Sequence, residues 1–359
     1  MKKDGLFHAV ITSDLHFKMN DRTPNPIIPQ MSLVENLTDE LMDAVLRMKP
    51  DAFIMLGDNT NSGNDKQSVL LKIKMNRLKE AGISVIPVPG NHDYDQCSPE
   101  RFMEIYSPLL LDYTREPGGN GFVTEIGNTA FLAMDDSASG GRICGKFSAA
   151  TLIWLENNLE DLQKRKKHIV FLSHHSVLSD REHIMQSHYC IQNRELLPLL
   201  KKYDVRICFS GHQHLPLMMR DGTLHEWISD MPVQTPHLIT HLYMTDTHAL
   251  IRSRPLRINN RRLDQRLNVS DSTQMNFLYD SFASAITEMP EPEKKGILKL
   301  YRKYLTARRD NLLPERKKEI QEDPFYSSLI GIKGSLGEMA DLTLRYLQDD
   351  LVIQLSDLL

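Results

Sequence analysis

Five short polar stretches of the chain contain side chains of the types that bind metal ions and carry protons. They are DLH (14–16), GDN (57–59), GNHD (90–93), SHHS (173–176) and GHQH (211–214). In an extended segment, residues i and i+2 point to the same face, so Asp14 and His16 can aim at one point, and His212 and His214 can do the same. Imidazole nitrogens and carboxylate oxygens together suit divalent ions of borderline softness. The spacing therefore predicts a metal site.

Each of these stretches follows a short apolar run that is typical of a buried strand. We expect strands at 7–12, 52–56, 83–88, 129–134, 168–172 and 205–209. We expect helices at 33–48, 66–81, 98–107, 148–165 and 193–202, with Ser148 as an N-cap. Alternating strands and helices indicate a layered α/β domain, in which ligands bind at the carboxyl ends of the strands. We therefore expect the five stretches to share one site.

The pattern changes in the second half of the chain. The stretch 224–258 predicts further strands, and the chain from residue 272 onward has helical patterning. This division predicts a main domain at 1–258, a linker at 259–271 and a helical C-terminal extension at 272–359. The arginine-rich stretch 252–266 has two interpretations, a solvated linker or a grip on a substrate phosphate.

Composition narrows the classes of protein to consider. The chain has 359 residues, is 41% hydrophobic and 25% charged, and carries a formal net charge of −4, which is typical of globular domains. A chain that is not strongly basic gives no reason to expect a stable nucleic-acid partner. We expect no membrane span, because no apolar run reaches about 18 residues. The N-terminus lacks the pattern of a signal peptide, so we expect a cytoplasmic protein.

The cysteines show no spacing that would indicate a zinc site or a disulfide framework. No CxxC pair occurs among them, and we expect free thiols. They are Cys97, Cys144, Cys190 and Cys208.

The five stretches, in this order, resemble the signature of the calcineurin-like metallophosphoesterase superfamily. That signature is D-x-H, G-D, G-N-H-[DE], H and G-H-x-H, and the resemblance covers roughly residues 7–250. It implies a four-layer α/β/β/α sandwich, here with an added C-terminal helical region, and two divalent metal ions, with Mn, Fe or Zn as candidates. The main domain is then the metallophosphoesterase catalytic domain.

The resemblance also assigns roles to individual residues. One ion would be held by Asp14, His16, Asp58 and His214. The other would be held by Asp58, Asn91, His174 and His212. His92 would be a histidine that binds no metal and faces the substrate, with Asp93 as its orienting partner.

This assignment implies a reaction. Two divalent ions with two carboxylates leave a surplus of about two positive charges, which attracts a phosphoester. A hydroxide bridging the ions would attack phosphorus directly, without a covalent enzyme intermediate. His92 would protonate the leaving oxygen, and Asp93 would fix its tautomer.

Further stretches indicate a branch of the superfamily. GDNTNSGN (57–64), SPERFMEIYSP (98–108) and GKFSAATLIWLENNL (145–159) resemble the bacterial class III cyclic-nucleotide phosphodiesterases that carry a helical C-terminal extension. GDNTNSG lacks the arginine that protein Ser/Thr phosphatases have in this motif. The resemblance implies hydrolysis of a small-molecule phosphodiester, with a 3′,5′-cyclic nucleotide as a candidate. The alternatives are a phosphomonoesterase, a phospholipid-headgroup phosphohydrolase, or a metal-free scaffold, which the complete ligand set disfavours.

Several single residues have competing interpretations. Only one of His174 and His175 can easily face a metal; the family pattern uses the first, which leaves His175 a supporting role. For the histidines outside the five stretches we expect structural or exposed positions. These are His188, His237 and His241.

Overall fold

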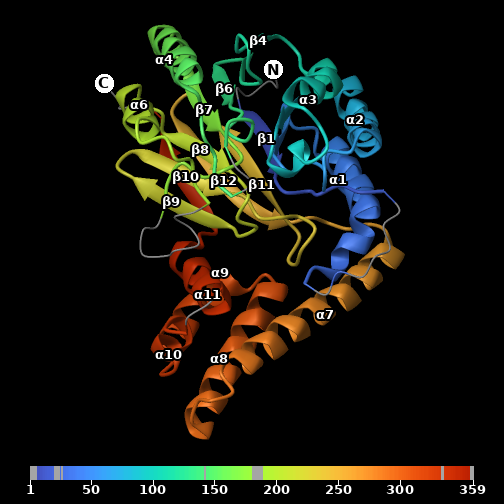
Figure 1. The fold of residues 1–359 in the computed structure, drawn as a ribbon, viewed down its shortest axis with the longest axis vertical. Coiled ribbons are helices and arrows are strands. Elements are labelled where there is room, and N and C mark those ends of the chain that lie inside the picture. Colours follow the sequence, from blue (N-terminus) through green and yellow to red (C-terminus); the bar gives the residue numbers. More distant parts are fainter. Residues whose placement is uncertain are drawn as a thin grey trace.

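Two β-sheets packed face to face, with helices on both outer sides, form the main body of the protein (Figure 1). The computed structural model describes residues 6–19, 25, 27–140, 143–179, 189–332 and 335–355. This arrangement is the four-layer α/β/β/α sandwich expected from the sequence.

The first sheet has the strand order β13-β12-β11-β1-β2-β3. Its strands are β1 (Phe7–Thr12), β2 (Ala52–Leu56), β3 (Ser84–Val88), β11 (Leu238–Met244), β12 (His248–Pro255) and β13 (Asp350–Gln354). Strands β1, β2 and β3 run parallel, and β11 joins β1 antiparallel. The carboxyl ends of β1, β2 and β3 therefore lie at one edge of the sheet.

The second sheet has the order β4-β5-β6-β7-β8-β10-β9. Its strands are β4 (Tyr113–Arg115), β5 (Phe122–Ile126), β6 (Thr129–Ala133), β7 (His168–Leu172), β8 (Ile207–Ser210), β9 (Leu217–Asp221) and β10 (Leu224–Ile228). Strands β6, β7, β8 and β10 are parallel. Alternate residues of β6 point to opposite sides: Phe131 joins the core between the sheets, and Leu132 joins the core beneath the outer helices.

The outer helices follow the strands closely. They are α1 (Val34–Met48), α2 (Asp65–Glu80) and α3 (Pro99–Tyr106) beside the first sheet, and α4 (Ala149–Lys164) and α6 (Leu196–Lys202) beside the second. Side-chain caps begin three of them, because the cap oxygen satisfies a free backbone N–H of the first turn. Asn64 caps α2, Ser98 caps α3, and Ser148 caps α4 as predicted.

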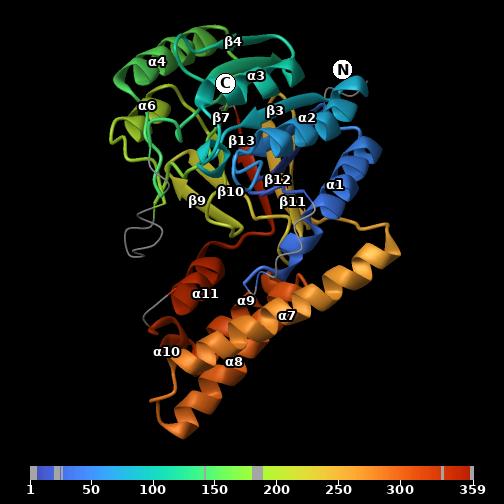
Figure 2. The same ribbon diagram turned by 45° about the vertical axis from the view of Figure 1, so that its right-hand side comes forward.

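The C-terminal part of the chain forms a helical lobe against one end of the sandwich (Figure 2). Its helices are α7 (Arg261–Ala285), α8 (Glu291–Arg309), α9 (Leu313–Gln321), α10 (Tyr326–Ile330) and α11 (Ser335–Tyr346). Phe282, Tyr301 and Leu305 belong to a hydrophobic core that this lobe has of its own. None of the described helices has the length and apolar character that crossing a bilayer requires.

Two boundaries differ from the expectation. Helix α7 begins at Arg261, inside the stretch 259–271 that we expected to be a linker, because Asn260 Oδ1 caps it by accepting from two backbone N–H groups. The extension is also not purely helical, since β13 returns to pair with β12. The lobe is therefore tied to the sandwich at both of its ends.

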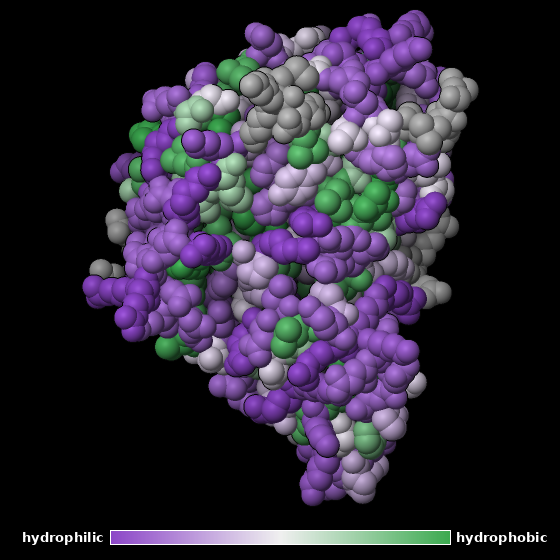
Figure 3. Space-filling model, turned by 180° about the vertical axis from the view of Figure 1, so that it is seen from behind, coloured by the Kyte–Doolittle hydropathy of each residue, from purple (hydrophilic) through white to green (hydrophobic). Residues whose placement is uncertain are grey.

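Two arginines of the stretch 252–266 contact acidic residues at the start of β13. Arg252 donates to Asp350, and Arg254 donates to Asp349 and Asp350. These two side chains thus hold β12 against β13, which corresponds neither to a solvated linker nor to a grip on a substrate phosphate. On the face of the molecule seen in Figure 3, hydrophilic residues predominate.

Candidate metal centre

The five polar stretches meet where the carboxyl ends of the parallel strands of both sheets converge. Asp14 and His16 follow β1, Asp58 follows β2 and Asn91 follows β3, whereas His174 follows β7 and His212 and His214 follow β8. All of them are at least nine-tenths buried except His212 and His214, which are partly buried. The structure thus brings together the seven ligand positions that the sequence predicts.

The first of two ligand groups surrounds Asp14. His214 Nε2 lies 3.1 Å from Asp14 Oδ1, and His16 Nε2 lies 3.3 Å from His214 Nε2. Asp58 Oδ2 lies 3.6 Å from His16 Nε2. The ligand atoms of Asp14, His16 and His214 all lie within 4.8 Å of one another, and Asp58 completes the set predicted for the first ion.

The second group surrounds His174. Its Nε2 lies 3.1 Å from Asn91 Oδ1, 3.2 Å from His212 Nδ1 and 3.5 Å from Asp58 Oδ1. Asp58 therefore turns one carboxylate oxygen toward each group. This is the arrangement that a carboxylate shared by two ions requires.

The backbone at the ligands differs from the extended form that the sequence suggested. Asp14 and His16 have φ of 51° and 45°, and His212 and His214 have φ of 64° and 53°. Asp58 is also left-handed, at 48°. Each such non-glycine residue costs about 1–3 kcal/mol, so the surrounding structure must hold these conformations. The i and i+2 side chains converge because both residues of each pair take the left-handed conformation.

Glycines allow these segments to approach each other. A Cβ at Gly57 would lie 2.3 Å from His174 Nδ1, and a Cβ at Gly90 would lie 2.1 Å from the backbone nitrogen of Asp58. Gly57 also has a φ of 86°, which favours glycine. These glycines therefore serve close packing around the ligands as well as the turns that the sequence predicted.

Hydrogen bonds orient the ligand atoms. Asp14 Oδ2 accepts from Ser13 Oγ and from the backbone N–H of His212, which leaves Oδ1 to face His214. His174 Nδ1 lies 2.8 Å from the carbonyl oxygen of Leu56, a contact in which only the nitrogen can donate. When His174 is neutral, its proton is thus on Nδ1, and the lone pair of Nε2 faces the second group.

The ionised carboxylates of the centre favour the binding of cations. Burial opposes ionisation of Asp58, but His174 and His16 hold the pKa of its carboxyl well below the usual range. Burial likewise opposes a charge on His174, yet Asp58 raises the pKa of this imidazole to about 10. Protons on histidine therefore balance the carboxylates when no ion is bound. Imidazole, carboxylate and amide donors that converge in this way fit divalent ions of borderline softness.

His92 stands at the edge of the centre with its side chain one-third exposed, at 34%. Its Nδ1 lies 3.2 Å from Asp95 Oδ2 and 3.2 Å from the carbonyl oxygen of Asn61. His92 also comes close enough to His16 and Asp58 to form a third group of possible ligands. Its assignment as a residue that binds no metal remains a prediction.

Asp93 does not orient His92, and this expectation is wrong. Its buried carboxylate accepts from the backbone N–H groups of Asn59, Thr60 and Gly90, and also from the side chains of Asn59 and Thr60. It therefore fastens the GDN loop to the GNHD loop. Asp95, three residues after His92, contacts the imidazole instead.

His175 and its partner Asp136 support the choice of His174 as the ligand. The backbone N–H of His175 donates to Asp136 Oδ2, and its Nδ1 lies 3.3 Å from Asp136 Oδ1. Both side chains are fully buried. His175 still lies near His174 and His212, and its bonds to Asp136 fix the loop that carries His174. No motif pointed to Asp136, whose signal is only the DD pair after the strand at 129–134.

Two of the histidines outside the five stretches lie away from the centre. His237 is buried and contacts Asp271, and His241 is buried beside His8. Both are structural, as expected. His188 lies outside the described residues.

A cavity of about 550 Å³ lies above the centre, between the sandwich and the helical lobe. Its floor includes Asp58, Asn91, His92, His212 and His214. Apolar residues of the lobe line the opposite side, namely Phe277, Leu278, Leu336 and Met339. Arg308 of α8 lines it as well. The sequence could not predict that these residues line the cavity, because the position of the lobe over the site depends on packing between distant parts of the chain.

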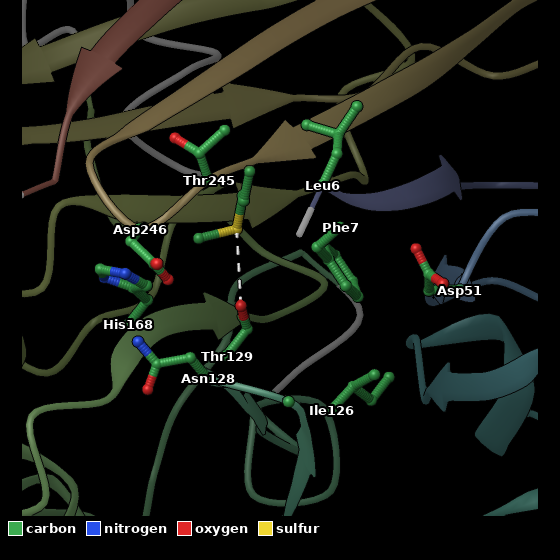
Figure 4. A pocket seen from close by; sticks show the side chains of 11 residues that line it. Leu6, Phe7, Asp51, Ile126, Asn128, Thr129, His168, Thr245 and Asp246 are labelled. Carbon is green, nitrogen blue, oxygen red and sulfur yellow. Dashed lines mark hydrogen bonds between the residues drawn. The ribbon is translucent and has the colours of Figure 1, made fainter. Parts of the chain in front are cut away.

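A second cavity lies away from the carboxyl ends of the strands and plays no part in the centre. Its volume is about 120 Å³, and its lining includes Phe7, Thr129, His168 and Asp246 (Figure 4). Thr129 Oγ1 there donates to the sulfur of Met244 at 4.0 Å.

Comparison with known proteins gives a family match. The family model described as calcineurin-like phosphoesterase matches residues 7–216, which is more than half of the chain. The chain is 29% identical over 170 residues to a protein of Arcobacter nitrofigilis named "probable glycerophosphodiester phosphodiesterase GpdQ". That match covers 47% of this chain and 58% of the relative, so this chain spans less than two thirds of the relative's length.

The chain also matches solved structures. A dimetal phosphatase from Danio rerio is 15% identical, with a TM-score of 0.55, and the match covers 71% of this chain and 98% of the other. A purple acid phosphatase from yellow lupin (Lupinus luteus) is 13% identical, with a TM-score of 0.45, over 70% of this chain and 51% of the other. The likeness to the dimetal phosphatase confirms the fold that the sequence predicted.

Proposed function

Because the chain belongs to the calcineurin-like phosphoesterase family, we propose that it is a phosphodiesterase that uses two divalent metal ions. The observation that carries the proposal is the position of Asp58, which directs Oδ1 toward His174 and Oδ2 toward His16. The first ion would be held by Asp14, His16, Asp58 and His214, and the second by Asp58, Asn91, His174 and His212. When bound, the ions would neutralise the charge of the phosphate group and acidify a water molecule.

The chain's own residues prepare the site for this chemistry. Ser13 and the backbone of His212 fix the carboxylate of Asp14, and the carbonyl of Leu56 fixes the tautomer of His174. Such supporting bonds keep the ligand atoms oriented before an ion arrives. The left-handed backbone conformations at the ligands serve the same preorganisation.

His92 is the candidate general acid. With Nδ1 donating to Asp95 and Asn61, Nε2 is the atom available to give a proton to a leaving oxygen on the cavity side. General acid catalysis of this kind contributes about 10²–10⁴-fold to a rate. The GNHD stretch therefore combines a ligand, Asn91, with a proton donor.

Two observations favour a diester over a monoester. The Arcobacter nitrofigilis relative is named as a phosphodiesterase, and the cavity above the centre is large enough to hold an esterified group beyond the phosphate. A 3′,5′-cyclic nucleotide is a candidate substrate. A phosphomonoester or a phospholipid headgroup on the same core is the alternative.

Steady-state hydrolysis by the Mn²⁺-loaded protein tests the proposal. Bis(4-nitrophenyl) phosphate, 3′,5′-cAMP and 4-nitrophenyl phosphate are compared in one assay, with Asp58→Ala as the control for metal-dependent activity. We expect the highest kcat/KM for a diester, and its loss in Asp58→Ala. A preference for the monoester would retain the metal centre and overturn the diester assignment.

A further inference from the structure

The cavity above the centre contains a buried positive charge that the proposed reaction does not use. Arg308, near the end of α8, is only 6% exposed and lines the cavity together with His214 and Gln234. Among the residues that the structure describes, no carboxylate lies within 4.0 Å of its guanidinium, and its polar neighbours are the hydroxyl of Tyr304 and the carboxyl of Asp230. A buried charge without a close carboxylate is unfavourable, so an anion that enters the cavity would gain an interaction here.

Nearby polar groups satisfy the guanidinium only in part. Asp230 interacts with Arg308 electrostatically, but its Oδ1 already accepts from Gln234 Nε2 and from the backbone N–H of Met231. Its Oδ2 is buried and has no hydrogen-bond partner in the described part of the chain, and the buried hydroxyl of Tyr304 is the neutral neighbour of the guanidinium. The cavity wall at Arg308 therefore retains unused hydrogen-bonding capacity.

Packing of the helical lobe fixes Arg308 in this position. Tyr301, Tyr304 and Leu305 precede it at helical spacing on the buried face of α8 and belong to the core of the lobe. A residue three to four positions further on lies on the same face, so Arg308 is held at the end of this row. Its neighbour Arg309 is exposed and pairs with Asp310.

We propose that Arg308 binds a second anionic group of the substrate, so that the substrate is a phosphodiester with a further phosphate or carboxylate in one of its esterified groups. This inference rests on the proposed phosphodiesterase function. A guanidinium is suited to this role because it can donate two parallel hydrogen bonds to such a group. Phe277, Leu278, Leu336 and Met339 would pack against the part of the substrate that connects the two anions.

A matched pair of chromogenic esters tests the assignment. The first is the 4-nitrophenyl ester of thymidine 5′-phosphate, and the second is the same ester with an added 3′-phosphate. Release of 4-nitrophenolate by the Mn²⁺-loaded protein reports cleavage of the diester in both. We expect the wild-type chain to have a higher kcat/KM for the ester with the 3′-phosphate.

The variants Arg308→Gln and Arg308→Lys should reduce that preference. We expect Arg308→Gln to lower the ratio of the two kcat/KM values by about 10- to 100-fold, the range for hydrogen bonds to charged groups. Arg308→Lys keeps the charge but loses the two parallel donors of the guanidinium. Its ratio of kcat/KM values should lie between those of the wild type and Arg308→Gln. Arg309→Gln, which changes an exposed arginine one residue away, should leave the ratio unchanged.

Other outcomes separate this inference from the function on which it rests. Equal loss for both esters in Arg308→Gln, or loss of bound metal, would make Arg308 a structural residue and overturn the inference. If the wild-type chain cleaves neither ester, the phosphodiesterase proposal fails, and calorimetric binding of thymidine 3′,5′-bisphosphate and thymidine 5′-phosphate decides the role of Arg308. Binding of the bisphosphate that is no tighter than that of the monophosphate, or that is unaffected by Arg308→Gln, would overturn it.

Discussion

His92 and Asp95 form the pair on which proton transfer to the leaving group would depend. His92→Gln should lower kcat by about 10²–10⁴-fold for a diester with an alkyl leaving group. The effect should be much smaller for a 4-nitrophenyl ester, because 4-nitrophenolate leaves without a proton. Asp95→Asn should cause a smaller loss with the same dependence on the leaving group, since Asp95 only holds Nδ1. Rates for the two esters, measured on each variant, check this.

The metal content of the same His92 variant decides between its two possible roles. We expect His92→Gln to retain both ions, as measured by elemental analysis after Mn²⁺ loading. A variant that has lost an ion would place His92 in the ligand group with His16 and Asp58, and the general-acid assignment would be withdrawn.

Substitutions of Asp58 and of His212 should leave different numbers of bound ions. Asp58→Asn removes a charge that both groups share, so we expect neither ion to remain tightly bound. His212→Gln changes only the second group, and we expect it to retain about one ion per chain, since each ligand group is otherwise complete. Titration of the metal-free variants with Mn²⁺, followed by calorimetry, gives the two stoichiometries. Equal stoichiometry in both variants would argue against the shared carboxylate.

At the scale of residues, the sequence predicted correctly which ligand side chains come together. It predicted less well the hydrogen bonds and backbone conformations that hold them. The seven ligand positions could be found because each follows a strand. Asp93 was assigned to His92 from the family resemblance, yet adjacent side chains on a tight turn diverge, and residue i+3 returns to the same side. The left-handed backbone at Asp14 and His16 also has no sequence signal, because it is imposed by packing around the centre.

At the scale of elements, α7 is joined to the sandwich by a buried polar cluster. Gln30 donates to Asp271 and Gln274, and His237 Nε2 lies 3.3 Å from Asp271 Oδ2. These contacts hold α7, which supplies Phe277 and Leu278, over the cavity. The position of the lobe therefore depends on a few hydrogen bonds as well as on apolar packing.

Asp271→Ala tests this junction. It leaves Gln30 and His237 without their shared partner, and loss of a partner to buried polar groups costs about 1–3 kcal/mol. We expect a decrease of that order in the free energy of unfolding, measured by urea denaturation, and a higher KM for the preferred diester. Asp280→Ala, at an exposed position on the same helix, serves as the control. No difference between the two variants would mean that apolar contacts alone position the lobe.

The elements of the sandwich could be predicted closely, whereas those of the C-terminal region could not. Strands β1, β2 and β7 have the predicted bounds, because their apolar runs end at polar turns. The start of α7 at Arg261 was missed, because its first turns are rich in arginine and resemble a solvated linker. Strand β13 was missed as well, because its place beside β12 depends on pairing across about a hundred residues.

At the scale of the whole molecule, the sequence predicted the sandwich and a helical addition but not their relation. Tyr301, Tyr304 and Leu305 mark a buried face of α8 that reaches Arg308, and an arginine on such a face is a signal that the sequence contains. Its role depends on the lobe, which lies against one end of the sandwich (Figure 2) and lines the cavity above the centre. Local patterns specify elements, whereas the cavity between two parts of the chain arises from their packing.

The buried carboxyl groups should make the stability of the chain depend on pH. Burial raises the pKa of Glu226 to about 7, although backbone N–H groups of the loop after His175 donate to it. A carboxyl whose pKa is higher in the folded state binds more protons when folded. Its contribution to stability is therefore present at low pH and is lost as the pH rises from the unfolded value toward about 7.

Glu226→Gln isolates this effect from that of the other titrating groups. For the metal-free protein, we expect the free energy of unfolding of the wild type, relative to Glu226→Gln, to fall by about 2 kcal/mol between pH 5 and pH 7.5. Urea denaturation at several pH values measures the difference. Glu288→Gln, at an exposed position, should give a curve parallel to that of the wild type. If the Glu226→Gln curve is parallel as well, Glu226 is ionised in the folded state across this range, and the donors from the loop after His175 outweigh its burial.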